Sequence, residues 1–139
     1  MEDGYEVEVV NGQLLKGRPY AFRELLTTRR PDIVGFSILQ ANRWGGIEIA
    51  KIAKQIHPKV KIVFGGVTPT FLWKHFLTHF PDIDFVVIGE GEYTFLNLVK
   101  FLENNKEYPL EDILGIAFRK DVKVIRTAPA EPIHDIYAL

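Results

Sequence analysis

The chain has 139 residues, enough for one domain with a buried core, and 47% of them are hydrophobic and 25% charged, an ordinary globular composition. With 17 basic and 18 acidic residues the net charge is −1, so bulk electrostatics favour neither nucleic acid nor an anionic membrane as a partner. The absence of cysteine excludes a disulfide framework, a zinc–thiolate site and a cysteine-ligated iron–sulfur cluster within this chain.

The sequence gives no sign of a membrane segment. No apolar run reaches the ~18 residues that a membrane-spanning helix needs. Residues 1–6 have neither the basic region nor the apolar stretch of a signal peptide. We therefore expect a cytoplasmic protein without a membrane or nucleic-acid partner.

The first elements are a strand and a short helix. Apolar and acidic residues alternate over residues 5–10, which predicts a strand with one solvated face near a sheet edge. Residues 21–26 predict a short helix whose apolar side chains form one stripe, and the helix is expected to end before Pro31.

The next three strands are of a different kind, because their apolar runs are nearly continuous, as in parallel strands covered on both faces. They are residues 33–34, 62–64 and 85–88. Helical patterns lie after them, at residues 47–56, 71–77 and 93–105. This alternation of strand and helix predicts right-handed βαβ crossovers.

The pattern changes after Pro109. Residues 113–118 and 122–126 leave no room for a helix between them, so they predict an antiparallel hairpin. We expect an α/β fold with a flavodoxin-like or Rossmann-like three-layer parallel sheet and this hairpin at its C-terminal end. The domain is expected to cover residues 1–127, followed by an extended linker at residues 128–139.

Three loops rich in small residues follow the buried strands, each where a strand is succeeded by a helix. They are residues 35–39, 65–68 and 89–92. In an open parallel sheet, ligands bind at this C-terminal edge of the strands. Because small residues let a ligand approach the backbone closely, the sequence predicts a binding platform at this edge.

The first loop continues into a polar stretch over residues 40–46. One interpretation is a polar loop that only leads into the next helix. The other is that the Ser37 hydroxyl and the Asn42 amide supply directed hydrogen bonds at the strand end. Trp44 is interpreted either as a core aromatic or as the exposed wall of a pocket.

In the second loop, Gly65 and Gly66 directly follow a buried strand. Two glycines cost backbone entropy and offer no side chain for packing, so they indicate either a group lying against the backbone or a turn with positive φ. Thr68 and Thr70 add hydroxyls beside a helix N-terminus, where free amides favour anions. The loop is not a Walker A motif, because no Gly-Lys-Ser/Thr follows.

The third loop, Gly89–Glu92, is not the dinucleotide fingerprint, because it carries acidic residues and lacks the third glycine. Glu90 and Glu92 are expected to accept hydrogen bonds from amides or hydroxyls, or to stabilise the start of the next helix. His75 and His79 have a spacing that allows metal binding. Without a third ligand we interpret them as surface residues.

Together the loops resemble the cobalamin-binding domain that precedes the catalytic barrel in cobalamin-dependent radical S-adenosylmethionine proteins. The matching segments follow the family's order and are residues 31–37, 63–67, 83–92 and 114–119. The string from Asp84 to Glu92 is the most specific. The resemblance implies that cobalamin is bound by Ser37, Leu39, Gln40, Asn42, Gly65, Gly66, Val67, Thr68, Gly89, Glu90, Gly91 and Glu92.

Within that set, the resemblance implies that Ser37, Leu39 and the two glycines line the path of the nucleotide tail, and that residues 89–92 border the corrin ring or its amides. The wider fold's Asp-x-His-x-x-Gly loop, which supplies a histidine to cobalt, is absent, as is common in the radical branch. Residues 4–9 resemble the element after the family's first strand and helix. A 2-1-3-4-5 sheet would then lack a central strand, and we expect residues 5–10 to pair with 32–38, or a neighbouring subunit to fill the position.

The sequence therefore predicts a cobalamin-binding module without catalysis of its own, since reductive cleavage of S-adenosylmethionine needs a cluster held by three cysteines. No catalytic and no metal-ligating residue is assigned. The expected partners are a radical S-adenosylmethionine domain, in cis or in trans, and a second copy in a homodimer. The alternatives are a degenerate flavodoxin-like interaction domain without a cofactor and a small nucleotide-binding α/β protein.

Overall fold

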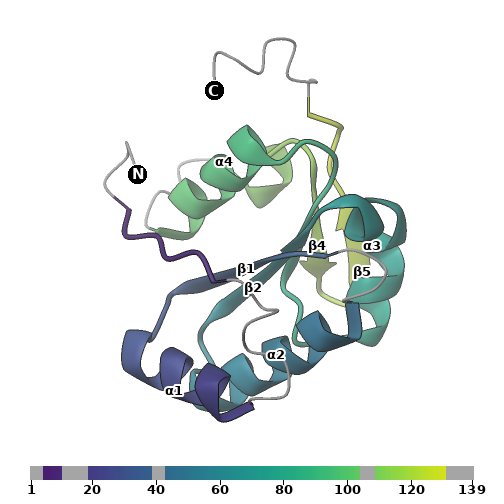
Figure 1. Cartoon of the computed structure of the whole chain (residues 1–139). Helices are drawn as coiled ribbons and strands as arrows, with labels where there is room; N and C mark the ends of the chain where they lie inside the picture. Colours follow the sequence, from purple (N-terminus) through teal and green to yellow (C-terminus); the bar gives the residue numbers. More distant parts are fainter. Residues whose placement is uncertain (1–4, 11–18, 39–42, 104–108, 131–139) are drawn as a thin grey trace.

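The computed structural model describes residues 5–10, 19–38, 43–103 and 109–130 and shows one five-stranded sheet with helices on both faces (Figure 1). The expected α/β fold class is confirmed. The strands are β1 (Ile33–Ser37), β2 (Lys61–Gly65), β3 (Phe85–Val87), β4 (Ile116–Lys120) and β5 (Lys123–Arg126). They lie side by side in chain order; β1 to β3 are parallel, and β4 and β5 form the expected antiparallel hairpin.

The helices are α1 (Pro19–Arg29), α2 (Arg43–Ile56), α3 (Val67–His79) and α4 (Glu92–Glu103), and a short 3-10 helix covers Leu110–Asp112. All four predicted helices are present. Helices α1 and α3 extend beyond both predicted ends, whereas α2 begins earlier than predicted and ends at the predicted residue 56. The predicted end of the last helix, at residues 104–105, lies outside the described residues. Helix α4 covers one face of the sheet, while α1 and α2 lie on the opposite side (Figure 1).

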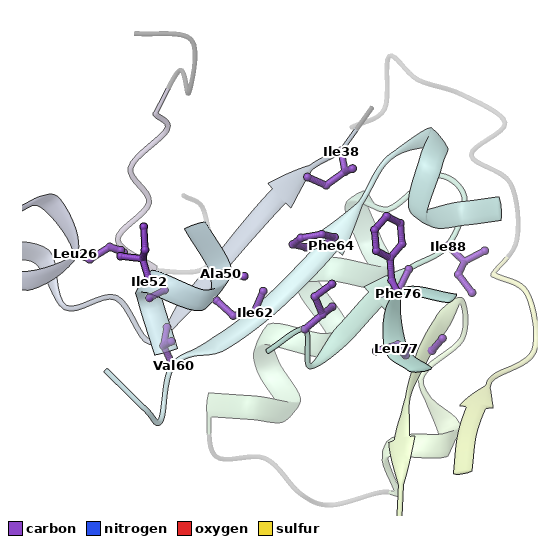
Figure 2. Packing of buried hydrophobic residues seen from close by; sticks show 14 residues of the cluster. Leu26, Ile38, Ala50, Ile52, Val60, Ile62, Phe64, Phe76, Leu77 and Ile88 are labelled. Carbon is purple, nitrogen blue, oxygen red and sulfur yellow. The ribbon is translucent and has the colours of Figure 1, made fainter. Parts of the chain in front are cut away.

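Two apolar clusters explain why the central strands are continuous apolar runs. Ile62 and Phe64 of β2 face the cluster shared with α2 and α3, where the Phe64 and Phe76 rings meet edge to face, 5.6 Å apart (Figure 2). Val63, between them, faces the second cluster, under Leu98 of α4. Successive strand residues point to opposite faces, so a strand covered on both sides needs apolar residues at every position.

Residues 5–10 correct the sequence-based prediction. They form no strand, and in the described part of the chain β1 pairs only with β2, so the expected ladder between residues 5–10 and 32–38 is wrong. Side chains hold the segment instead: the Tyr5 hydroxyl donates to Glu103 at 2.7 Å, and Glu8 pairs with Arg29 at 3.0 Å. An alternating pattern specifies a strand only when its apolar face is buried. Here that face is not buried, since Val9 is 91% exposed.

The chain leaves the sheet beside the first turn of α4. Ala128 follows β5, and its carbonyl accepts a hydrogen bond from the N–H of Gly115, the residue before β4, at 2.8 Å. A Cβ placed on Gly115 would lie 3.1 Å from Ala130 and 3.2 Å from the Thr94 hydroxyl. No helix in the described ranges is both long and apolar enough to cross a membrane.

Candidate functional site

The first two predicted loops meet at the C-terminal edge of the sheet. Ser37, the last residue of β1, is in register with Gly65, the last residue of β2. The backbone N–H of Ile38 donates to the Gly65 carbonyl at 2.8 Å. The loop after β1 is therefore fixed directly to the loop after β2.

A single hydroxyl joins the second loop to the third. Thr70, in the first turns of α3, donates from Oγ1 to the Gly66 carbonyl at 2.7 Å. The same oxygen accepts the N–H of Gly89 at 3.0 Å. From the sequence, only the place of this hydroxyl beside a helix N-terminus was evident. Its role as the link between the two loops depends on the distance between strands and was not predictable from spacing.

Three small residues leave the face of β1 and β2 under α4 with little side-chain bulk. Alternation along the strands places Gly35, Ser37 and Gly65 on this face; we call these three residues the open strip. A Cβ on Gly35 would lie 3.6 Å from the Phe95 ring of α4, and one on Gly65 would lie 3.8 Å from Cβ of Val87. Gly35 and Ser37 are nevertheless exposed, so α4 and its Phe95 ring cover this part of the sheet only in part.

The other glycines of the predicted site have reasons within the chain itself. Gly66 has φ 108° and ψ −170°, a combination essentially restricted to glycine, and its Cβ would lie 3.0 Å from the Ile38 carbonyl oxygen. A Cβ on Gly91 would lie 2.7 Å from Cγ1 of Val87. Gly89 has φ 78°. The fold needs glycine at these positions whether or not a ligand binds.

The remaining predicted residues surround this edge in different ways. Val67 is 62% exposed, whereas the neighbouring Thr68 is buried. Glu90 and Glu92 are exposed, and Glu92 lies in the first turn of α4, where a carboxylate complements the helix dipole. The predicted residues Leu39, Gln40 and Asn42 lie outside the described residues.

The histidine pair does not extend into a metal site. The rings of His75 and His79 lie 4.8 Å apart, centre to centre, and both residues are exposed on α3. Among the residues that the structure describes, no group of three or more His, Cys, Asp or Glu side chains is arranged to hold a metal ion.

Comparison with known proteins identifies the family. Residues 1–99 match the B12 binding domain. The chain belongs to the B12-binding domain family. This match confirms the resemblance seen in the loops. Cobalamin, which is vitamin B12, is the cofactor of this module.

Curated relatives extend the comparison. The chain is 47% identical over 79 residues to an anaerobic magnesium-protoporphyrin IX monomethyl ester cyclase of Synechocystis, covering 57% of the chain and 15% of the relative. It is 35% identical over 116 residues to the cyclase of Rubrivivax gelatinosus, covering 82% of the chain and 21% of the relative. The chain thus spans about a fifth or less of these relatives' lengths.

A solved structure shares the fold. The radical S-adenosylmethionine methyltransferase TsrM of Kitasatospora setae, solved with cobalamin and a [4Fe-4S] cluster bound, superposes with a TM-score of 0.78 at 18% identity. The superposition covers 97% of this chain and 25% of TsrM. The Rossmann-like arrangement of this chain is therefore the fold of one part of a much larger protein.

Proposed function

We propose that the open strip and the three loops around it bind cobalamin, and that the chain presents this cofactor to a separate catalytic domain. Gly65 carries the proposal. Its φ lies outside the left-handed region and a Cβ would meet only ordinary contacts at 3.8 Å and beyond, so the fold itself has room for a side chain there. A glycine inside a strand weakens the strand and marks places where a ligand or another backbone approaches closely.

The strip fits a bulky cofactor with a long tail. Gly35 and Gly65 give the tail a smooth sheet surface, and Ser37 lies beside them on the same face. We also assign Leu39 and Gly66 to the path of the tail, and Gln40 and Asn42 to cobalamin binding, as the resemblance implies. Bound cobalamin would accept or donate a methyl group, or steer radical chemistry.

The rim of the site would hold the ring. Glu90 and Glu92 are exposed carboxylates that accept hydrogen bonds from the amide groups of a corrin, and Val67 offers an exposed apolar contact. Gly89 and Gly91 shape the loop that carries the two carboxylates, and Thr68 is a buried residue at the start of α3. The chain's own residues bind and orient the cofactor.

The partner of this module is a radical S-adenosylmethionine domain, in cis or in trans, because the chain has no cysteine to hold an iron–sulfur cluster. Two observations support a partner at the site. The relatives are much longer than this chain, and the linker at residues 128–139 starts beside the first turn of α4, next to the rim. Pairing with a second copy and a cytoplasmic location complete the proposal.

Titration with hydroxocobalamin, followed by the absorption of the corrin, tests the proposal. Wild-type chain should give saturable spectral changes. Gly65→Val places a β-branched side chain on the strip and should weaken binding at least about tenfold, which corresponds to about 1.4 kcal/mol. Gly45→Ala is the matched control, because a Cβ at Gly45 meets nothing within 4 Å, and it should bind as the wild type does.

Two results would contradict the proposal. Wild-type chain that causes no saturable change would be a domain that keeps the fold without the cofactor. Equal affinity of Gly65→Val and wild type would place the cofactor away from the open strip.

A further inference from the structure

A cavity of about 300 Å³ lies between α2 and α3, away from the open strip. Its apolar walls are Trp44, Ile47, Leu72, Phe76 and Phe80. These side chains belong to, or pack against, the apolar cluster on the face opposite α4. The sheet therefore separates this cavity from the predicted path of cobalamin.

The cavity has a buried floor and an exposed aromatic wall. Phe76 is only 1% exposed, whereas Trp44 is 62% exposed although its indole lines the cavity. The Trp44 and Phe80 rings meet edge to face, with their centres 6.2 Å apart. Aromatic walls of this kind hold flat apolar rings, and a cavity of this volume lies at the small end of ligand pockets.

Arg43 supplies a cation at the cavity. The guanidinium carbon of Arg43 lies 5.1 Å from the centre of the Trp44 ring, in a cation–π contact that leaves the in-plane N–H groups able to donate. Within the described ranges Arg43 has no carboxylate partner, and none of the residues lining the cavity is acidic.

The start of α2 adds to this positive character. Its first turn contains no acidic residue, so the helix dipole and Arg43 act in the same sense. His75, which also lines the cavity, adds a ring N–H that can donate a hydrogen bond. An anionic group bound beside Arg43 would therefore relieve the repulsion between that cation and the positive end of the helix.

We propose that this cavity binds a small aromatic carboxylate of one or two fused rings, a ligand distinct from cobalamin. The ring lies against Trp44 and Phe80, and the carboxylate accepts hydrogen bonds from the Arg43 guanidinium. A planar carboxylate matches the fork of arginine donors in a bidentate arrangement, which gives the site its preference for carboxylates over alcohols and amines.

The test uses 2-naphthoate as the probe and 2-naphthalenemethanol as its uncharged counterpart, with binding to the full chain followed by amide chemical shifts in NMR. Naphthoate should give saturable shifts centred on Arg43, Ile47 and His75. Arg43→Gln should weaken naphthoate about tenfold and leave the alcohol unchanged, because only the carboxylate contact is lost. Lys51→Gln, which removes an exposed cation from the same helix, should change neither.

Three results would overturn the inference. These are shifts that never saturate or spread over the whole surface, equal losses in Arg43→Gln and Lys51→Gln, and displacement of naphthoate by hydroxocobalamin. The last would assign the cavity to the cofactor site. Because the two sites lie on opposite faces of the sheet, failure of the cobalamin titration alone leaves the naphthoate result standing.

Discussion

Two adjacent glycines show how differently the same residue type is used. Gly65 ends β2 and has room for a Cβ. Gly66 has a backbone conformation that only glycine adopts easily, and a Cβ there would lie 3.0 Å from the Ile38 carbonyl oxygen. Both occur in one motif, and only the first points to a ligand. A substitution series at this motif must therefore separate loss of fold from loss of binding.

Gly66→Ala should lower the free energy of unfolding by about 1–3 kcal/mol, the cost of placing a side chain in a glycine-only region. Urea denaturation monitored by circular dichroism measures the change. The exposed helical control, Gly45→Ala, should instead raise stability by up to about 1 kcal/mol. Equal stability of Gly66→Ala and wild type would show that the loop relaxes to accept a Cβ.

At the scale of elements, one arginine fastens α3 to the hairpin. Arg119 of β4 donates to the carbonyls of Leu77, at 2.7 Å, and Pro81, at 3.0 Å, and also to that of Ile83. The first acceptor belongs to the last turns of α3 and the others to the turn before β3. One guanidinium thus satisfies carbonyls that neither a helix nor a sheet would pair.

Arg119→Lys should lower the free energy of unfolding by about 1–2 kcal/mol, because one ammonium cannot reach all three carbonyls in the geometry of the fork. Arg126→Lys, the same replacement on β5, keeps a cation over the Trp73 ring and should cost no more than about 0.5 kcal/mol. Thermal and urea unfolding measure both. Matching losses in the two variants would contradict the assigned role.

The elements that the sequence predicted best are those whose residue pattern directly indicates which faces are buried. The continuous apolar run 62–64 indicates a strand covered on both faces, and β2 is such a strand. Residues 5–10 show the opposite case, since alternation requires a face to bury and the fold supplies none. Asp84, the first residue of the most specific string, accepts the Ile62 N–H at 2.8 Å and pairs with Lys54 at 2.7 Å, so its role is structural.

The arrangement of the candidate site was predictable in part. Sequence located the three loops at one edge because the carboxyl ends of parallel strands lie together. It could not separate Gly65 from Gly66, since backbone angles and neighbouring atoms distinguish them. The cavity between α2 and α3 depends on how two helices cross, and α3 bends at Leu72, which has φ −111° and ψ 23°. No local pattern encodes that crossing. The sequence left Trp44 open between a core aromatic and an exposed pocket wall, and in the structure it is exposed and lines this cavity.

At the scale of the whole molecule, cofactor binding should stabilise the fold by mass action. Hydroxocobalamin at 100 times its Kd should raise the free energy of unfolding by about 2.7 kcal/mol, provided that the unfolded chain does not bind it. At the same concentration, a tenfold weaker Gly65→Val should gain only about 1.4 kcal/mol. Circular dichroism melts with and without cofactor measure this. An unchanged melting temperature in the wild type would contradict binding to the folded chain.

β1 is an edge strand, so among the described residues one of its two long sides has no neighbouring strand. Asp32 and Ile38 direct their backbone groups toward β2, so alternation turns the N–H and carbonyl of Ile33 and Gly35 outward. Any sixth strand added there, from this polypeptide or another, would lie alongside Gly35. If cobalamin occupies the open strip as proposed, such a strand would also border its nucleotide tail, and the affinity for the cofactor would then depend on whether that strand is present.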